Sequence, residues 1–152
     1  PFGKTNPNSV EALTKVKVCV FQRSDFDQFA REHPELEHKL LERTLTELDR
    51  SRRWMLLLGR MTAEQKLANF LLETVDRFAP AMCGFVPNAG PIKLTLLLTR
   101  QQIADILGLT IETVSRQFTR MKSLGLIDMP SQREVTIFDR EALENCSGIS
   151  NL

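Results

Sequence analysis

Three polar side chains in the second half of the chain have the chemistry and the spacing to read DNA bases. Glu112, Ser115 and Arg116 lie at positions that share one face of a helix. An arginine can donate two hydrogen bonds to guanine, a glutamate can accept one from cytosine, and a serine can do either. Together they predict a surface that recognises double-stranded DNA in the major groove.

Two short helices must position this surface. Thr99 and Gln102 form a T-x-x-Q pattern, which is typical of a capping box and predicts a helix that starts at residue 99. Gly108 suits the left-handed backbone conformation that ends a helix. Thr110 then predicts the cap of a second helix over residues 111–123.

The order helix, glycine turn and helix is typical of a helix-turn-helix. Apolar spacing turns Val114, Phe118 and Met121 inward in the second helix, and Ile103, Ala104, Ile106 and Leu107 inward in the first, with Leu109 buried in the turn. Residues 126–128 and 134–138 read as two strands, which predict a wing after the second helix. The alternative is two packed helices in an ordinary all-α core.

Basic residues gather locally although the net charge of the whole chain is only +1. Arg120 and Lys122 follow Arg116, and we expect them to contact phosphate. The residues expected to contact the DNA backbone or to support the helix-turn-helix are Thr99, Arg100, Gln101, Thr110, Thr113, Thr119, Arg120 and Lys122.

A long helix is predicted over residues 34–58, because this segment has no proline after its first residue and no glycine. Its apolar positions follow a 4-3-4-3 spacing with one polar break, which is typical of a coiled-coil seam. The seam is formed by Leu41, Leu45, Leu48, Arg52 and Met55. We expect this helix to join two copies of the chain; the alternative is an amphipathic helix packed within its own domain.

The other segments give weaker signals. Residues 12–22 alternate between apolar and polar side chains, which predicts a strand with one buried face, and Ser24 predicts the cap of a short helix. Thr62 and Gln65 predict a second capping box and a helix over residues 63–78, which follows a break at Gly59. A loop over 79–91, a short strand over 92–96 and a last helix capped by Asp139 complete the pattern.

The apolar runs, the cysteines and the first residue of the chain narrow the class of protein. The apolar runs are too short to cross a bilayer, so we expect no membrane partner. The three cysteines are widely spaced and form no CxxC pair, which favours a reducing cytoplasm over a disulfide framework or a zinc site. The chain begins without methionine, and we expect it to be part of a longer protein.

The segment L-T-R-Q-Q-I-A-D-I-L-G-L-T-I-E-T-V-S-R resembles the winged helix-turn-helix of the CRP/FNR superfamily of bacterial transcription regulators. The pattern E-x-x-S-R, formed by Glu112, Ser115 and Arg116, is similar to the FNR and FixK branch. Residues 34–58 resemble the dimerisation helix of the superfamily. Residues 12–32 resemble the end of its N-terminal β-roll sensor domain, so the resemblance covers nearly the whole chain.

The resemblance implies a mainly α fold with a small β wing, divided into the end of a β-roll (1–33), a dimerisation helix (34–58) and a winged helix-turn-helix domain (59–152). It also implies a homodimeric activator that reads a palindromic site and recruits RNA polymerase. Ile111 and Ser115 occupy positions where the cyclic-AMP-binding branch has arginine and glycine. This departure favours TTGA half-sites.

The sequence shows no cofactor site, and the sensor ligand stays unknown. The nucleotide cassette of the cyclic-AMP branch and the cysteine cluster of FNR are not seen, and Ser51 and Arg52 stand where that branch has a nucleotide-contacting Thr-Ser pair. His33 and His38 are five residues apart, off the spacing of a helical metal pair, so we expect no enzyme. A helical protein–protein interaction module without DNA binding is the alternative function.

Cys83 is a candidate redox residue. It lies in the predicted loop ahead of the helix-turn-helix. If it is exposed near cations, its thiol would be reactive, and its oxidation would place negative charge near DNA. The alternative is a small buried apolar side chain.

Overall fold

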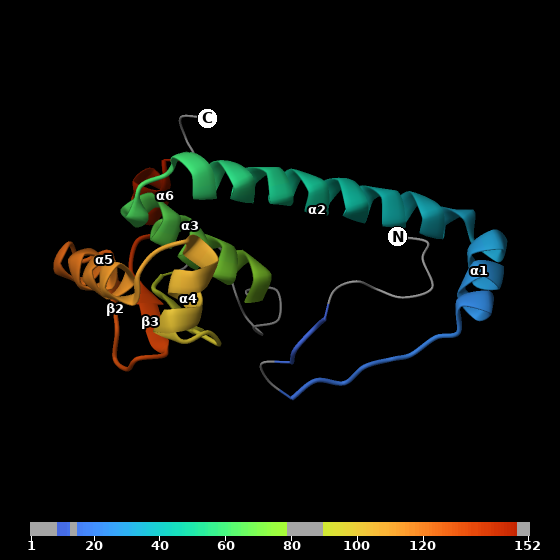
Figure 1. Ribbon diagram of the computed structural model, residues 1–152, viewed down its shortest axis with the longest axis horizontal. Helices are drawn as coiled ribbons and strands as arrows, with labels where there is room; N and C mark the ends of the chain where they lie inside the picture. Colours follow the sequence, from blue (N-terminus) through green and yellow to red (C-terminus); the bar gives the residue numbers. More distant parts are fainter. Residues whose placement is uncertain (1–8, 13–14, 79–89, 149–152) are drawn as a thin grey trace. The chain divides into compact units, whose positions relative to one another are not determined.

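The computed structural model describes residues 9–12, 15–78 and 90–148, in two compact units that meet within one helix, after Glu47 (Figure 1). The N-terminal unit ends at Glu47, and the C-terminal unit begins at Leu48. Cys83 and most of the predicted loop over 79–91 lie outside the described residues.

The strand predicted over residues 12–22 is wrong for the part of it that the structure describes. Residues 15–22 form neither helix nor strand. Val16, Val18 and Val20 are 57%, 75% and 87% exposed, so the predicted buried face is absent among them. Alternation marks a strand only where a neighbouring strand accepts its backbone hydrogen bonds and covers one face, and the described part of the N-terminal unit has no such strand.

Two helices follow in the chain. Helix α1 (Arg23–Glu32) begins one residue before Ser24, and the Ser24 hydroxyl donates to Asp25 instead of capping the helix. Helix α2 (Pro34–Arg60) starts at the proline, as predicted, and continues through Gly59. A single glycine costs a helix only about 1 kcal/mol, so it did not end α2 where the sequence suggested.

The C-terminal unit packs three further helices and a small sheet around one core, together with the end of α2 and the short helix α6. Helix α3 (Ala63–Phe78) begins at the predicted capping box, since Thr62 and Gln65 exchange hydrogen bonds. Its side chains Leu67 and Leu71 are fully buried, together with Ile103 and Leu107 from α4 (Arg100–Leu107). Helix α5 (Ile111–Ser123) packs on both α3 and α4.

The wing is a sheet of three antiparallel strands in the order β1-β3-β2, not the predicted pair. Strand β3 (Glu134–Ile137) lies between β2 (Ile127–Asp128) and β1 (Ile92–Thr95). Ile137 pairs with Ile127 on one side and with Ile92 on the other. The chain ahead of α4 therefore belongs to the wing, which ties the start of the helix-turn-helix to its end.

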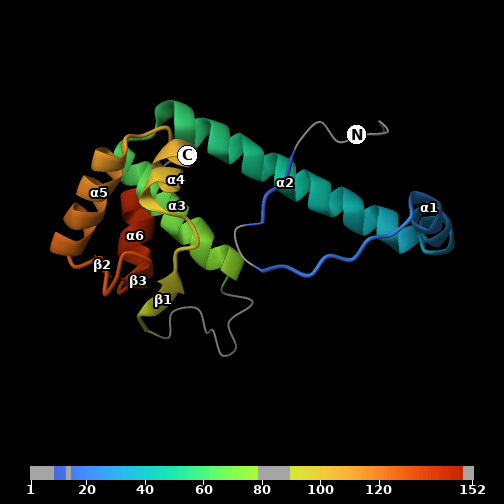
Figure 2. The same ribbon diagram turned by 60° about the horizontal axis from the view of Figure 1, so that its bottom comes forward.

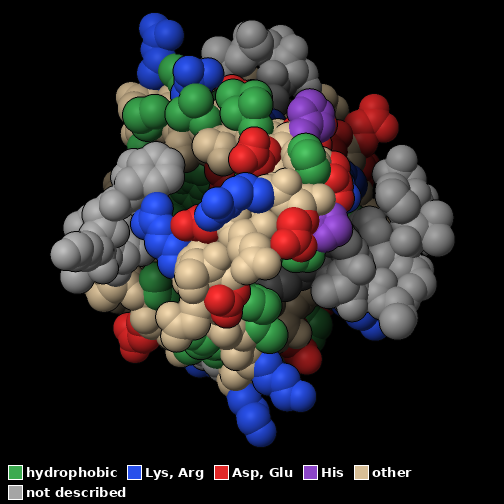
Figure 3. Space-filling view, turned by 90° about the vertical axis from the view of Figure 1, so that its right-hand side faces the viewer, with side chains coloured by type: hydrophobic (Ala, Val, Ile, Leu, Met, Phe, Trp, Pro, Cys, Tyr) green, Lys and Arg blue, Asp and Glu red, His purple; other side chains and the backbone are tan. Residues whose placement is uncertain are grey.

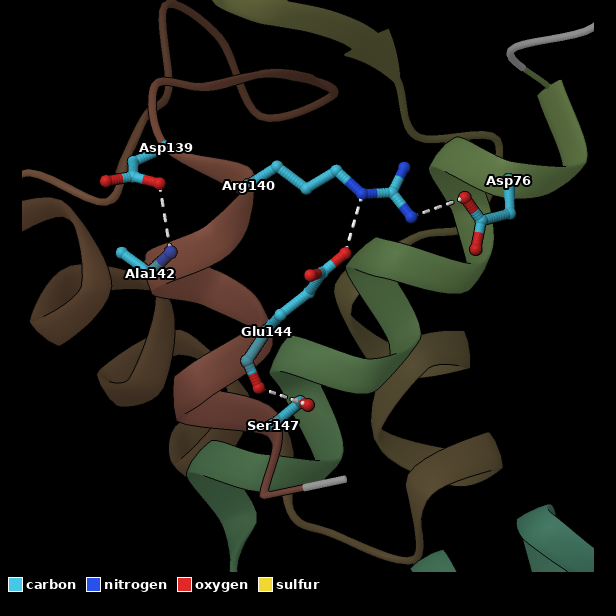
Figure 4. Close-up of polar contacts among 6 residues, drawn as sticks. All are labelled: Asp76, Asp139, Arg140, Ala142, Glu144 and Ser147. Carbon is cyan, nitrogen blue, oxygen red and sulfur yellow. Dashed lines mark hydrogen bonds and ion pairs between the residues drawn. The ribbon is translucent and has the colours of Figure 1, made fainter. Parts of the chain in front are cut away.

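Helix α6 (Arg140–Ser147) lies beside α3 (Figure 4). Asp139 caps it as predicted, by accepting a hydrogen bond from the backbone amide of Ala142 at 2.9 Å. Arg140 contacts Glu144 within α6 and Asp76 on α3, at 2.7 and 2.9 Å (Figure 4). The pair with Asp76 joins the N-terminal turn of α6 to α3, and the pair with Glu144 orients the Arg140 side chain.

A buried lysine connects α3 to the end of α4. The side chain of Lys66 is among the buried residues, and its Nζ donates to the Leu107 carbonyl at 3.2 Å. The last carbonyl groups of a helix lack partners within the helix and carry partial negative charge. Lys66 therefore supplies both a hydrogen bond and a positive charge to the C-terminal end of α4.

Basic, acidic and histidine side chains are all visible on the face of the molecule in Figure 3. His33 lies 3.1 Å from Glu35, and His38 lies 3.5 Å from Glu42, so each contacts a carboxylate near the solvent. Within the described ranges, no helix is long and apolar enough to cross a membrane.

Candidate nucleic-acid interface

The helix-turn-helix forms where the sequence predicts it. Thr99 and Gln102 form the capping box of α4, in which each side chain accepts a hydrogen bond from the other residue's backbone amide. Gly108 adopts the left-handed conformation at φ 61° that glycine reaches without steric cost. The Thr110 hydroxyl then accepts a hydrogen bond from the Thr113 amide at 3.2 Å and caps α5. Local contacts therefore define where α4 ends and where α5 begins.

Helix α5 divides into a buried and an exposed face. Val114, Phe118 and Met121 are buried, as predicted.

Two smaller predictions, outside α5, were wrong. Ile106 is 43% exposed, and Leu109 is only partly buried. Ile106 lies at the edge of the packed face of α4, and Leu109 lies in the short turn, where neighbouring side chains cover only part of it.

The predicted base-reading residues lie together on the exposed side of α5. Glu112, Ser115 and Arg116 are all exposed, and α5 lies at the edge of the C-terminal unit in two different views (Figure 1 and Figure 2). Nη2 of Arg116 lies 3.4 Å from the Thr113 hydroxyl. Within the described part of the chain, no carboxylate lies within ion-pair distance of Arg116.

Glu112 stands in the first turn of α5. Hydrogen bonds from its backbone and from the Thr110 side chain lower the pKa of its carboxyl group. Glu112 therefore stays ionised and can accept hydrogen bonds. A carboxylate and a guanidinium one helical turn apart form the donor and acceptor set that distinguishes base pairs in the major groove.

Arg100 supports the helix-turn-helix from within. Its guanidinium carbon lies 3.3 Å from the centre of the Phe118 ring, which is a cation–π contact between α4 and α5. Nη2 points to the Met129 sulfur at 2.7 Å, whereas Nη1 is buried and has no acceptor among the described residues. Burial lowers the pKa of Arg100 to about 10, so the group stays charged at neutral pH.

Other predicted support residues make local hydrogen bonds. Gln101 donates to Asp105 at 2.8 Å within α4, and Thr119 donates to the Ser115 carbonyl at 3.0 Å within α5. Both residues are exposed, so these bonds leave their surfaces open to a ligand.

The two cations at the end of α5 have acidic partners that the sequence analysis missed. Arg120 Nε lies 3.5 Å from Glu64 on α3, and Lys122 Nζ lies 2.8 Å from Asp128 on β2. A shallow groove of about 270 Å³ runs beside Lys122, lined also by Arg100, Ser115, Phe118, Thr119 and Met129. Periodicity could not reveal these pairs, because each joins α5 to a different element.

The predicted dimer seam is exposed along α2. Leu41, Leu45, Leu48 and Met55 are 56%, 51%, 43% and 64% exposed. Arg52 lies 3.2 Å from Asp49 on the same helix. Leu57, which is outside the seam, is buried in the core of the C-terminal unit.

Known proteins are similar to this chain in both fold and sequence. The fold and site define a winged helix-turn-helix protein, and the model of the Crp-like helix-turn-helix domain matches residues 65–146. The chain is 42% identical over 95% of its length to a probable transcriptional activator of Rhizobium leguminosarum, and 41% identical over 91% to the activator FnrL of Cereibacter sphaeroides. The chain therefore belongs to the CRP/FNR family, in the branch of FNR- and FixK-type regulators.

A solved structure agrees with the family assignment. FixK2 from Bradyrhizobium japonicum matches 82% of this chain and 58% of its own chain, with a TM-score of 0.68 and 35% sequence identity. The chain spans 58% of the Rhizobium activator and 55% of FnrL. The similarity thus covers nearly all of this chain and somewhat more than half of each relative.

Proposed function

We propose that the chain is a sequence-specific DNA-binding transcription regulator whose α5 reads bases in the major groove. The observation that carries the proposal is the exposed face of α5, where Glu112, Ser115 and Arg116 stand opposite a fully buried apolar face. Packing against α3 and α4 holds the helix in place, so its polar face is preorganised for a ligand.

The bases that these side chains would recognise follow from their chemistry. Arg116 would donate to a guanine, and Glu112 would accept from a cytosine amino group. TTGA and its complement TCAA each offer one of these bases. The pattern E-x-x-S-R, through its resemblance to the FNR and FixK branch, supports TTGA half-sites.

The second part of the proposal is a homodimer joined through the seam of α2. The exposed leucines Leu41, Leu45 and Leu48 form an apolar stripe without a partner among the described residues. A second copy of the same helix would cover this stripe in a self-complementary interface. Two-fold symmetric helix-turn-helix dimers read half-sites about one DNA turn apart, so the proposed dimer fits a palindromic site.

The third part of the proposal is a role in recruiting RNA polymerase, which is supported by relatives named transcriptional activators. We propose that the chain acts in the cytoplasm, as a regulator and not as an enzyme. Cys83 remains a proposed redox residue, on the basis of its position in the sequence alone.

Binding of two duplexes of equal length tests the function. One carries two inverted TTGA half-sites, and the other carries the same bases in scrambled order. We expect fluorescence anisotropy to show binding of the palindrome about 10³-fold tighter or more, with affinity that falls as salt rises. Equal binding of both duplexes would exclude base reading. Binding of neither would favour a protein–protein interaction module.

A further inference from the structure

A lysine on the exposed side of α5 is held by a carboxylate of the same chain. Nζ of Lys122 lies 2.8 Å from Oδ1 of Asp128, and the two side chains are 55% and 40% exposed. The hydrogen bond from Lys122 is the largest cause that lowers the pKa of Asp128, so the carboxylate is ionised at neutral pH. The pair is therefore a charge-assisted contact that solvent, and a larger ligand, can reach.

Lys122 belongs to the same surface as one of the base-reading residues. Ser115, Thr119 and Lys122 line one groove, and their spacing places them along one side of α5 over two helical turns. A duplex whose bases contact Ser115 and Arg116 would bring its phosphate backbone along this side. Lys122 is then an exposed cation on this side of α5, and Asp128 is the anion that it already contacts.

The neighbouring pair serves as a comparison. Arg120 also has a carboxylate partner, Glu64, at the longer distance of 3.5 Å. Arg120 does not line the groove, and Glu64 comes from α3 and not from the wing. The shorter ion-pair distance and the position in the groove therefore make Lys122 the cation at which competition between a carboxylate and phosphate should be stronger.

We propose that Asp128 acts as an internal competitor of DNA phosphate for Lys122, and thereby limits the affinity of binding. The inference rests on the proposed function of α5. In the free protein the ammonium donates to Asp128, whereas on DNA it would turn to a phosphate oxygen and leave the carboxylate to solvent. No bond other than this hydrogen bond changes.

The size of the effect follows from the exposure of the pair. Exposed ion pairs are weak, so releasing Lys122 should raise affinity only about two- to five-fold. Because phosphate contacts are not specific to base sequence, the gain should be similar on palindromic and scrambled duplexes. Because Lys122 contacts a phosphate in the wild-type complex as well, Asp128→Asn should leave the slope of log K against log salt nearly unchanged. Loss of the contact in Lys122→Gln should make the slope shallower by about 0.9.

A double-mutant cycle on the 152-residue chain tests the proposal. Wild type, Asp128→Asn, Lys122→Gln and the double variant are titrated with both duplexes over a salt series. We expect Asp128→Asn to bind both duplexes about two- to five-fold more tightly with a slope close to that of wild type, and Lys122→Gln to bind both less tightly with the shallower slope. In the Lys122→Gln background the same change should give no gain. A gain that persists without Lys122 would overturn the proposal, because it would come from net charge alone.

Two controls keep the result unambiguous. Glu141→Gln changes the net charge equally but stands in the first turn of α6, and we expect it to leave affinity within about two-fold of wild type. Asp128→Ser removes the same carboxylate and should reproduce the gain of Asp128→Asn. Thermal unfolding checks that both variants fold. Wild-type binding without a gain in either Asp128 variant would overturn this inference alone. Failure of wild type to bind either duplex would overturn the proposed function, and this inference with it.

Discussion

The long helix α2 and the pair α4–α5 both carry apolar residues at helical spacing, but the structure uses the two regions differently. In α5, Val114, Phe118 and Met121 are buried by α3 and α4 of the same chain. In α2, Leu41, Leu45 and Leu48 are roughly half exposed. Similar periodicity thus gives a satisfied core in one region and an open surface in the other.

The difference shows that an apolar stripe specifies burial but not the partner that provides it. Helices of α4 and α5 length gain most of their stability from tertiary packing, and a short turn at Gly108 brings them together. The seam of α2 has no such neighbour among the described residues. Substitutions in the buried face of α5 should therefore change folding, whereas substitutions in the seam should change association.

The largest effect is expected in the seam. Replacing both Leu45 and Leu48 with lysine should separate the proposed dimer, because buried like charges would face each other. Loss of the second half-site contact should weaken binding to the palindrome about 10²–10⁴-fold. Sedimentation and anisotropy measure the two results. The control variant Thr44→Lys/Thr46→Lys adds the same charge to exposed positions beside the seam and should stay dimeric; a dimeric mass for both variants would refute the seam.

The packed face of α5 should respond in stability instead. Phe118→Ala removes a buried ring that also makes the cation–π contact with the Arg100 guanidinium. This substitution should lower the free energy of unfolding by about 3–5 kcal/mol. Urea denaturation followed by circular dichroism measures this loss. Leu124→Ala, at a 57% exposed position, should change stability by about 0.5 kcal/mol or less. Equal losses in the two variants would contradict the place of Phe118 in the core of the C-terminal unit.

The exposed face of α5 should affect neither folding nor association. Arg116→Ala should cost about 1–3 kcal/mol in binding the palindrome and much less on the scrambled duplex. Its melting temperature should stay near that of wild type, since Arg116 is exposed. Arg120→Ala should instead weaken both duplexes to a similar degree. If Arg116→Ala behaves in the same way as Arg120→Ala, then Arg116 contacts phosphate and not a base.

The smallest effect is expected at the start of α4. Thr99→Ala removes the side chain that accepts the Gln102 amide hydrogen bond, which should cost about 1 kcal/mol in unfolding free energy. Gln101→Ala, one helical position past Arg100 and exposed, should cost less than about 0.5 kcal/mol. Thermal unfolding of the two variants compares these values, and an unchanged midpoint for Thr99→Ala would contradict the role of the capping box.

Local signals in the sequence predicted much of this structure. The capping residues Thr62, Thr99, Thr110 and Asp139 and the turn at Gly108 were identified from the sequence, because each acts through contacts within a few residues. The buried face of α5 followed from its period. The strand expected over 12–22 was wrong because a strand depends on a partner that local alternation does not show.

Contacts between distant segments were the part that the sequence did not reveal. The third strand of the wing arises from the pairing of Ile92 with Ile137, and the ion pair of Arg120 with Glu64 joins α5 to α3. The partial burial of Arg100 depends on Phe118 and Met129, which lie in other elements. In each case the environment of one residue depends on a partner that is distant in the sequence, and local spacing does not predict such a partner.

The contact between Lys66 and the Leu107 carbonyl also limits how this chain can vary during evolution. The position needs a side chain long enough to cross from α3 to the end of α4 and positive at its tip. Methionine has comparable length but would leave the carbonyl group without a donor, and glutamate would oppose the partial negative charge there. Position 66 should therefore accept lysine or arginine and few other residues among related sequences. Lys66 lies far from Glu112 and Arg116 in the sequence, so the half-site that we propose α5 reads can diverge while the contact beneath it stays the same.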